Sequence, residues 1–185
     1  MSAKEIVLLI LGGVLANNFV FEKFLGVTPL LGAAKKGGKL LALGLSVLAV
    51  MLIVAPLAWV LQTALLAPKG LGYLQIPVFA ALVLLVTWLL GLVADKAFKK
   101  PLGVYFPVIA LNSAVLGLAV AAAETDLLTA VLTALGAGLG FLAALPVFAG
   151  LLSKIDEQAV PKAFRGFPIQ ILAAGIVSLA LLAFK

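Results

Sequence analysis

The chain has 185 residues, of which 65% are hydrophobic and 11% are charged, and its formal net charge is +6. Soluble domains carry about a quarter charged residues, so this composition excludes a soluble protein and predicts a single integral membrane domain over residues 1–185. The sequence contains no cysteine and no histidine, which excludes disulfides and any metal site built from thiolate or imidazole groups of this chain. We attribute the positive charge to lysines at one face of a bilayer, and we expect lipid rather than nucleic acid around the chain.

Six apolar windows predict an all-α integral membrane fold of six transmembrane helices, because about 20 apolar residues cross the hydrocarbon core. In chain order the windows are Ile6–Phe21, Leu40–Pro68, Gly70–Ala94, Pro101–Ala123, Leu127–Ser153 and Gly166–Phe184. The first window is short, and Glu22 and Lys23 separate it from a second apolar stretch at Phe24–Ala34. Since a backbone can break inside a membrane only where protein or water satisfies its polar groups, we expect an irregular first helix.

The distribution of lysine and arginine predicts how the helices are oriented. The loops after the first, third and fifth windows carry nine of the 13 basic residues, and the opposite side carries three. The nine are Lys35, Lys36, Lys39, Lys96, Lys99, Lys100, Lys154, Lys162 and Arg165, and the three are Lys4, Lys69 and Lys185. Because positive residues stay on the cytoplasmic side, we expect the nine in the cytoplasm and both termini outside.

Sliding the sequence on itself by 94 residues aligns several features without a gap. "VLANN" at 14–18 falls on "VIALN" at 108–112, so that Asn18 meets Asn112, and Gly44 meets Gly138. An offset of three windows reverses the direction of crossing and predicts two inverted three-helix repeats, about 1–97 and 98–185. Helices 1 and 4 become equivalent, and we expect both to be interrupted at mid-membrane.

The polar residues of these two helices have interpretations that the sequence leaves open. Asn17, Asn18 and Asn112 either join neighbouring helices by hydrogen bonds or line a site at the bilayer midplane. Charged groups inside a membrane are costly and usually functional. Either Lys23 extends to the interface while Glu22 pairs with a nearby lysine, or the two residues mark an ion path.

Three blocks of the sequence resemble a known family. They are "NNFVFEKFLGVTPLLG" at 17–32, "LGVYFPVIALNSAVLG" at 102–117 and "VPKAFRGFPIQILAAGIVSLAL" at 160–181. Together they resemble the A-type membrane component of the Rnf/Rsx electron-transport complex, whose sibling is the E-type component of the sodium-pumping NADH:quinone reductase, Nqr. The resemblance implies six helices with helices 1 and 4 half-broken, and a prokaryotic inner-membrane location. It also implies a homologous partner of opposite topology, E-like of Rnf or D-like of Nqr, beside other redox subunits.

The resemblance further implies a [2Fe-2S] cluster at mid-membrane, shared by the two homologous partners and held by one cysteine in each of the first two blocks of each partner. This sequence has Thr28 and Ser113 at those positions. Neutral hydroxyls are poor ligands for iron–sulfur chemistry, which uses thiolates, and both hydroxyls have the alternative of bonding back to helix carbonyls. Three explanations remain open: a different or incomplete cluster in the partner, function without a cluster, or deliberate replacement of the cysteines.

The leading hypothesis is a membrane subunit of an Rnf/Nqr-type complex that carries electrons across the membrane and couples them to sodium or proton export. No nucleophile–base pair, metal cluster or phosphate loop is visible in the sequence, so we expect no self-contained catalytic site in this chain. The alternative is a redox-silent transporter or channel-like pair, with Asn18, Asn112, Thr28 and Ser113 as an uncharged polar lining. A weaker alternative is a purely structural assembly subunit.

Overall fold

The computed structural model describes residues 2–27, 40–98, 106–156, 158–181 and 183, and every regular element in these ranges is helical. The helices are α1 (Ala3–Val14), α3 (Leu40–Leu61), α4 (Gln75–Phe98), α5 (Phe106–Ala110), α6 (Ser113–Ala123), α7 (Leu127–Ser153) and α8 (Phe167–Leu181). A π-helical turn at Gln62–Leu66 extends α3, and 3₁₀ turns occur at Gly72–Leu74 and Lys162–Phe164. The predicted site residue Thr28 lies outside the described residues.

Three of the predicted windows form helices that are long and apolar enough to cross a membrane. They are Leu40–Leu66, Gly72–Ala94 and Leu127–Ser153, and shorter apolar helices cover Val108–Ala123 and Phe167–Leu181. The prediction of an all-α, multi-pass membrane protein is therefore confirmed. The exact number of six crossings and the inverted repeat stay predictions, because α1 has only 12 residues and the fourth window is divided between α5 and α6.

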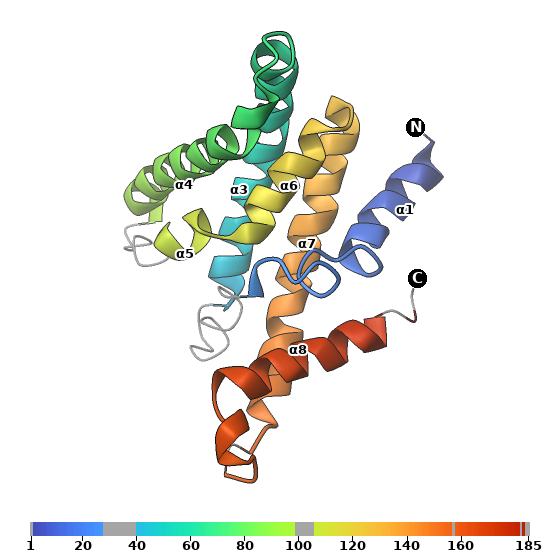
Figure 1. Cartoon of the computed structure of the whole chain (residues 1–185), viewed down its shortest axis with the longest axis vertical. Helices are drawn as coiled ribbons and strands as arrows, with labels where there is room; N and C mark the ends of the chain where they lie inside the picture. Colours follow the sequence, from blue (N-terminus) through green and yellow to red (C-terminus); the bar gives the residue numbers. More distant parts are fainter. Residues whose placement is uncertain (1, 28–39, 99–105, 157, 182, 184–185) are drawn as a thin grey trace.

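The core of the bundle is the contact between α3 and α7, which lie side by side at the centre of Figure 1. Helix α1 packs on α7, while α6 packs on both central helices, and α8 crosses the lower part of α7. Small side chains allow these close approaches, as is usual where lipid offers no hydrophobic driving force between helices. Alanines with no exposed surface in the described part of the chain include Ala55, Ala58, Ala114, Ala119, Ala130 and Ala134.

The α3–α7 contact contains a reciprocal pair of glycine–leucine contacts. A Cβ atom added to Gly44 would collide with Cδ1 of Leu142, and a Cβ atom added to Gly138 would collide with Cδ1 of Leu48. Gly138 follows Gly44 by 94 residues, and Leu142 follows Leu48 by the same offset. A contact in which each side meets the equivalent of the other is the pattern that a two-fold axis produces.

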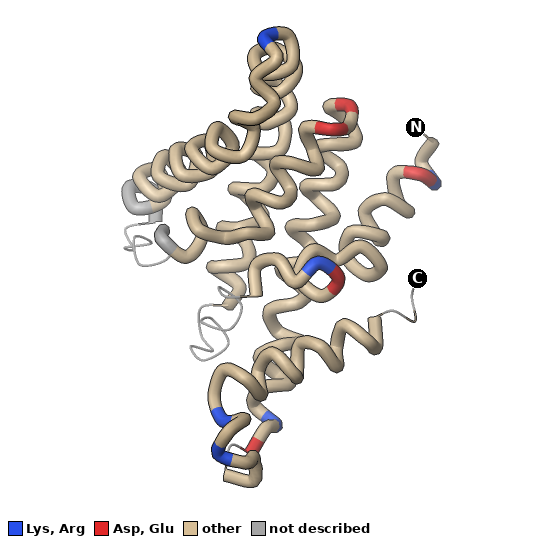
Figure 2. Tube along the Cα trace, in the orientation of Figure 1, with Lys and Arg blue, Asp and Glu red and all other residues tan. Residues whose placement is uncertain are grey.

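Side-chain caps fix several helix ends. The Ser2 hydroxyl accepts from the backbone N–H of Glu5 at 3.3 Å, and the Glu5 carboxylate accepts from the N–H of Ser2 at 3.0 Å, which starts α1 with a capping box. Asp126 starts α7 by accepting from the N–H of Thr129 at 3.1 Å. Figure 2 shows that the charged residues of the described helices lie at helix ends, except in the segment after α1.

Candidate functional site

Two interruptions of helical structure, one in each half of the chain, form the candidate site. Helix α1 ends at Val14, and residues 15–26 continue mainly as turns that lie beside α6 and α7 (Figure 1). In the second half, α5 ends at Ala110 and α6 begins at Ser113, so the break falls on residues 111 and 112. The breaks therefore include Asn18 and Asn112, the pair that the 94-residue offset aligned.

Asn18 is 2% exposed and uses both ends of its amide. Its Oδ1 accepts from the backbone N–H groups of Val20 at 2.8 Å and Phe21 at 3.3 Å. Its Nδ2 donates to the carbonyl oxygens of Val14 at 2.8 Å and Gly140 at 3.2 Å. The side chain therefore ties the broken first helix to α7 and satisfies backbone groups that the break would otherwise leave open.

Asn112 is 1% exposed and makes the same kind of cap on the second break. Its Oδ1 accepts from the N–H of Ala114 at 2.9 Å, which starts α6. This bond also fixes the orientation of the amide, because a flipped amide would place a donor against that N–H. Its Nδ2 has no hydrogen-bond partner among the described residues. The second break thus presents the N–H donor of Asn112 beside the positive N-terminal end of α6. This arrangement would bind a hydrogen-bond acceptor better than a cation.

A difference between the two central helices explains why the two amides differ. Helix α7 carries Gly136 and Gly140 where α1 approaches, and a Cβ added to Gly140 would lie only 2.6 Å from the carbonyl oxygen of Gly13. At the positions 94 residues earlier, α3 carries Ala42 and Ser46 instead of glycines. The close backbone approach that brings the Gly140 carbonyl to Asn18 is therefore not repeated for Asn112.

The two interrupted segments meet directly. The backbone N–H of Gly26 donates to Oγ of Ser113 at 2.9 Å, across 87 residues of chain. Ser113 is exposed in the single chain, and its neighbour Leu111 is 79% exposed. A hydroxyl between two breaks of apolar helices, on an outward face, needs a partner that satisfies it within a membrane.

Gly26 has a backbone conformation and close surroundings that favour glycine. Its φ angle is +75°, in the left-handed region that costs L-residues about 1–2 kcal/mol. An added Cβ would lie 2.8 Å from Oδ1 of Asn112, and 3.0 Å from both Cβ of Ala114 and Cε2 of Phe141. The close approach of the two segments at this point therefore depends on the missing side chain.

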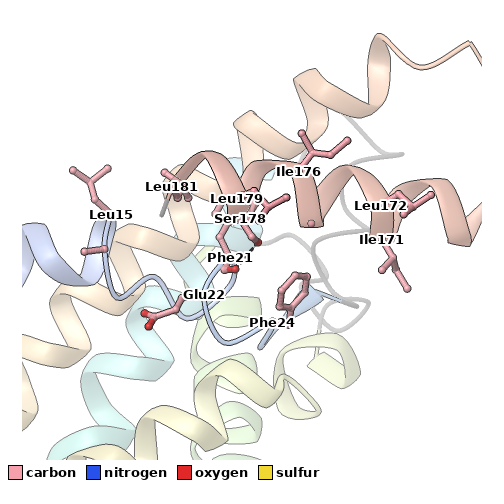
Figure 3. A pocket seen from close by; sticks show the side chains of 12 residues that line it. Leu15, Phe21, Glu22, Phe24, Ile171, Leu172, Ile176, Ser178, Leu179 and Leu181 are labelled. Atoms are coloured by element: carbon pink, nitrogen blue, oxygen red, sulfur yellow. Dashed lines mark hydrogen bonds between the residues drawn. The ribbon is translucent and has the colours of Figure 1, made fainter. Parts of the chain in front are cut away.

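A cavity of about 590 Å³ lies between the segment after α1 and helix α8 (Figure 3). Its walls are apolar apart from Glu22 and Ser178, and the Ser178 hydroxyl donates to the carbonyl oxygen of Phe21 at 2.5 Å. Glu22 is half-buried at the edge of this cavity, while Lys23 is exposed with its Nζ 4.5 Å from the ring centroid of Phe19. The structure therefore places Glu22 at the cavity and leaves Lys23 exposed, with its ammonium group over the Phe19 ring.

The predicted site residues are only partly brought together. Asn18, Asn112 and Ser113 lie at the two breaks, and Asn17 lies beside them but is exposed. The sequence interpretation missed Gly26 as a contact residue, and it missed the hydrogen bond that the Gly140 carbonyl accepts from Asn18. A signal for Gly26 was present, because it follows the charged pair closely in a segment with a predicted break, whereas the role of Gly140 depends on tertiary packing.

The residues of this chain do not fit the [2Fe-2S] cluster that the resemblance implies. Such clusters are held by thiolates, or by imidazoles on one iron, and the sequence has neither cysteine nor histidine. The Ser113 hydroxyl already accepts a hydrogen bond from Gly26. Within the described ranges, no group of three or more His, Cys, Asp or Glu is placed to hold a metal ion. We therefore derive no electron-transfer step through a cluster bound by this chain.

The apolar helices define a multi-pass membrane protein in which helical structure is interrupted after α1 and between α5 and α6. A family profile described as "Rnf-Nqr subunit, membrane protein" matches residues 6–185, and the chain belongs to this family. It is 35% identical over 185 residues to the A-type component of the Na(+)-translocating ferredoxin:NAD(+) oxidoreductase complex of Acetobacterium woodii, covering 97% of this chain and 96% of the relative. It is 37% identical over 186 residues to the A-type component of the ion-translocating oxidoreductase complex of Syntrophotalea carbinolica, covering 98% of this chain and 96% of the relative.

Proposed function

We propose that this chain is the A-type membrane component of an ion-translocating oxidoreductase complex of the Rnf/Nqr type, in a prokaryotic inner membrane. The observation that carries the proposal is the similarity to A-type components of such complexes, which extends over nearly the whole of both chains. The two interrupted helices support it, because paired breaks in corresponding positions mark the working site in membrane proteins built from repeats.

In this proposal the chain consists of two inverted repeats, about 1–97 and 98–185. The reciprocal contacts of Gly44 with Leu142 and of Gly138 with Leu48 support an axis between α3 and α7. So do the matching caps that Asn18 and Asn112 make on the N–H group two residues ahead. The two halves would then expose the site at the two breaks alternately to the two sides of the membrane, and this movement would carry the ion across.

The partner in this proposal is a homologous membrane protein of opposite topology, E-like of Rnf or D-like of Nqr. The surface at the two breaks supports a covering partner, since Ser113 is exposed there together with Leu111 and Phe24, which are 79% and 47% exposed. A polar group facing outward between apolar helices is costly in lipid, and a protein partner removes that cost. Other redox subunits of the complex would supply the electron chemistry.

The orientation proposed from the sequence places both termini outside. The α3–α4 and α6–α7 turns lie at one end of the molecule, and the α7–α8 connection lies at the other (Figure 1). The charged residues that the structure describes in these connections are Lys69, Glu124 and Asp126 at the first end and Lys154, Asp156, Lys162 and Arg165 at the second. The basic excess of the second end supports a cytoplasmic position for it.

The ion path proposed here includes Glu22, with Lys23 as its neighbour on the outer surface of the segment. Two observations support a role for Glu22: it lines the cavity against α8, and the charged pair lies between the helices rather than at a helix end (Figure 2). Ionisable residues within membrane segments commonly mark ion or proton pathways, which supports a role for Glu22 in the path.

A redox-silent transporter pair is the second candidate. It is favoured by one observation, the absence of cysteine from the sequence, which leaves the joint between the segments with hydroxyl, amide and backbone groups only. The two candidates differ in their driving force. Ion movement by the first requires electron flow through the complex, whereas ion movement by the second does not.

The test is to delete the gene, complement it with a tagged copy and prepare inverted membrane vesicles. Redox-driven uptake of sodium ions or protons should be lost on deletion and restored by the tagged chain. The tagged chain should also purify with a homologous membrane protein and with flavin-containing or ferredoxin-like proteins. Ion movement that persists without any electron donor would favour the redox-silent transporter.

A further inference from the structure

We infer that the joint between the two interrupted segments of this chain is iron-free and is held by hydrogen bonds, with Ser113 as the positioning residue. The resemblance and the residues of this chain disagree at this joint. The resemblance places a thiolate at position 113, and the chain has a serine whose Oγ accepts from the N–H of Gly26 at 2.9 Å. This joint involves this chain's own residues and is compatible with either of the two functions above.

The chemistry of a hydroxyl suits this joint and does not suit iron. A serine hydroxyl is neutral and keeps its proton, whereas iron–sulfur chemistry calls for a soft, deprotonated sulfur ligand. As an acceptor for a backbone N–H, however, the oxygen of a hydroxyl forms a shorter and stronger hydrogen bond than a thiol sulfur does. With serine in place of cysteine at position 113, the side chain is no longer suited to bind iron, but it links the two segments directly through the Gly26 hydrogen bond.

The surroundings of Gly26 make that link important. The residue is buried, and the atoms nearest to the position of an added Cβ are Asn112 Oδ1, Ala114 Cβ and Phe141 Cε2. The Ser113 oxygen is the acceptor that the Gly26 N–H uses in the described part of the chain. Without that oxygen, the N–H would be left without an acceptor in a mainly apolar place, which costs about as much as the desolvation of a backbone amide.

The position of Ser113 on α6 explains how it can make the link. Asn112 is the cap residue of α6, so Ser113 is the first residue of that helix and its side chain stands at the edge of the break. The cap bond from the N–H of Ala114 to Asn112 Oδ1 holds this turn in place. The Ser113 hydroxyl therefore lies at a fixed helix end, and its hydrogen bond holds the segment after α1, which has little helical structure of its own.

The first experiment measures the thermal unfolding of the full chain in detergent. Ser113→Ala should lower the midpoint by about 2–4 °C, the shift expected for one lost hydrogen bond to a buried amide in a chain of this size. Ser113→Thr keeps the hydroxyl and should restore most of the loss. Ser46→Ala is the matched control, because the Ser46 hydroxyl donates only within its own helix, to Ala42 at 2.8 Å. Equal midpoints for Ser113→Ala and Ser46→Ala would overturn the inference.

The second experiment measures iron and acid-labile sulfide in the chain, purified anaerobically with its co-expressed membrane partner. The natural chain should hold no iron above a protein-free control, and a chelator should leave its midpoint unchanged. The variant T28C/S113C, which places thiols at the two positions where the resemblance has cysteines, serves as the gain-of-binding comparison. Stoichiometric iron and sulfide in the natural chain would overturn the inference. If no partner binds, the proposed function fails, and the first experiment still decides the role of Ser113.

Discussion

Asn18 and Asn112, which stand 94 residues apart, make the same hydrogen bond: each Oδ1 accepts from the backbone N–H two residues ahead, at 2.8 and 2.9 Å. They differ at the other end of the amide. Nδ2 of Asn18 donates to Val14 and Gly140, whereas Nδ2 of Asn112 has no partner within the described part of the chain. The Asn18 side chain therefore joins the first break to α7, whereas Asn112 keeps an N–H donor available at the second break.

This difference predicts unequal effects of the same substitution. Serine can still cap a break through its oxygen but cannot reach the second acceptor. Asn18→Ser should therefore destabilise the chain by about 1–3 kcal/mol, the usual cost of losing buried hydrogen bonds, and Asn112→Ser should cost less than about 1 kcal/mol. Thermal unfolding of both variants in the same detergent measures the difference. Equal losses would show that the Gly140 contact contributes little.

The second prediction concerns the close contact at Gly26. Gly26→Ala should destabilise the chain by about 2–5 kcal/mol, because it combines left-handed backbone with crowding against Asn112 and Phe141. Gly166→Ala is the matched control, since Gly166 also has a positive φ, of 81°, but an added Cβ there meets no atom within 4 Å. Expression level and unfolding midpoint should fall much further for Gly26→Ala, and a similar fall for both would contradict the crowding.

The third prediction tests the approach of α1 to α7. A Cβ at Gly140 would lie 2.6 Å from the carbonyl oxygen of Gly13, so Gly140→Ala should push the helices apart and cost about 1–3 kcal/mol. Gly150 lies in the same helix with no atom within 4 Å of an added Cβ. Gly150→Ala should therefore be neutral or stabilising, by up to about 1 kcal/mol of helix propensity. A stable Gly140→Ala variant would argue against this packing.

Much of the fold could be predicted from the sequence, because apolar length alone identifies membrane helices. The windows at Leu40–Pro68, Gly70–Ala94 and Leu127–Ser153 correspond closely to the observed spans. The break after Val14 was also predictable, since asparagines, charges and glycine follow one another there. The three family blocks led to the Rnf-Nqr family, and the comparison with known proteins confirms it.

The finer geometry of the site could not be predicted, because it depends on which faces of distant helices touch. Nothing local in the sequence distinguishes the satisfied Asn18 from the partly open Asn112. The difference follows from Gly140 on one helix and Ser46 at the corresponding position of the other. Likewise, the hydrogen bond between Gly26 and Ser113 joins residues 87 positions apart, and only the folded chain brings them together.

The fourth prediction concerns the proposed ion path. Glu22→Gln removes a carboxylate from the cavity wall while keeping the size of the side chain, so redox-driven ion uptake should fall by roughly tenfold or more without loss of the assembled complex. Glu5→Gln is the control, because Glu5 belongs to the exposed capping box of α1, and glutamine is compatible with that box. Unchanged uptake with Glu22→Gln would remove Glu22 from the path.

The fifth prediction is a pH dependence at the start of α7. The Thr129 hydroxyl and backbone N–H donate to Asp126, and these bonds lower the pKa of its carboxyl below the ordinary 3.8. Because the folded pKa is the lower one, the ionised cap stabilises the chain above pH 3.8 and this stabilisation is lost as the pH falls through the folded pKa. Asp126→Asn should remove this part of the acid sensitivity, as unfolding midpoints of both proteins between neutral and acidic pH would show.

The most direct measurement is redox-driven ion uptake by inverted vesicles from cells that carry the natural chain, no chain, or the Glu22→Gln variant. The function proposed here predicts uptake that needs an electron donor, disappears with the chain and is strongly reduced by the variant. Donor-dependent uptake that continues undiminished without the chain, in an otherwise intact complex, would contradict it.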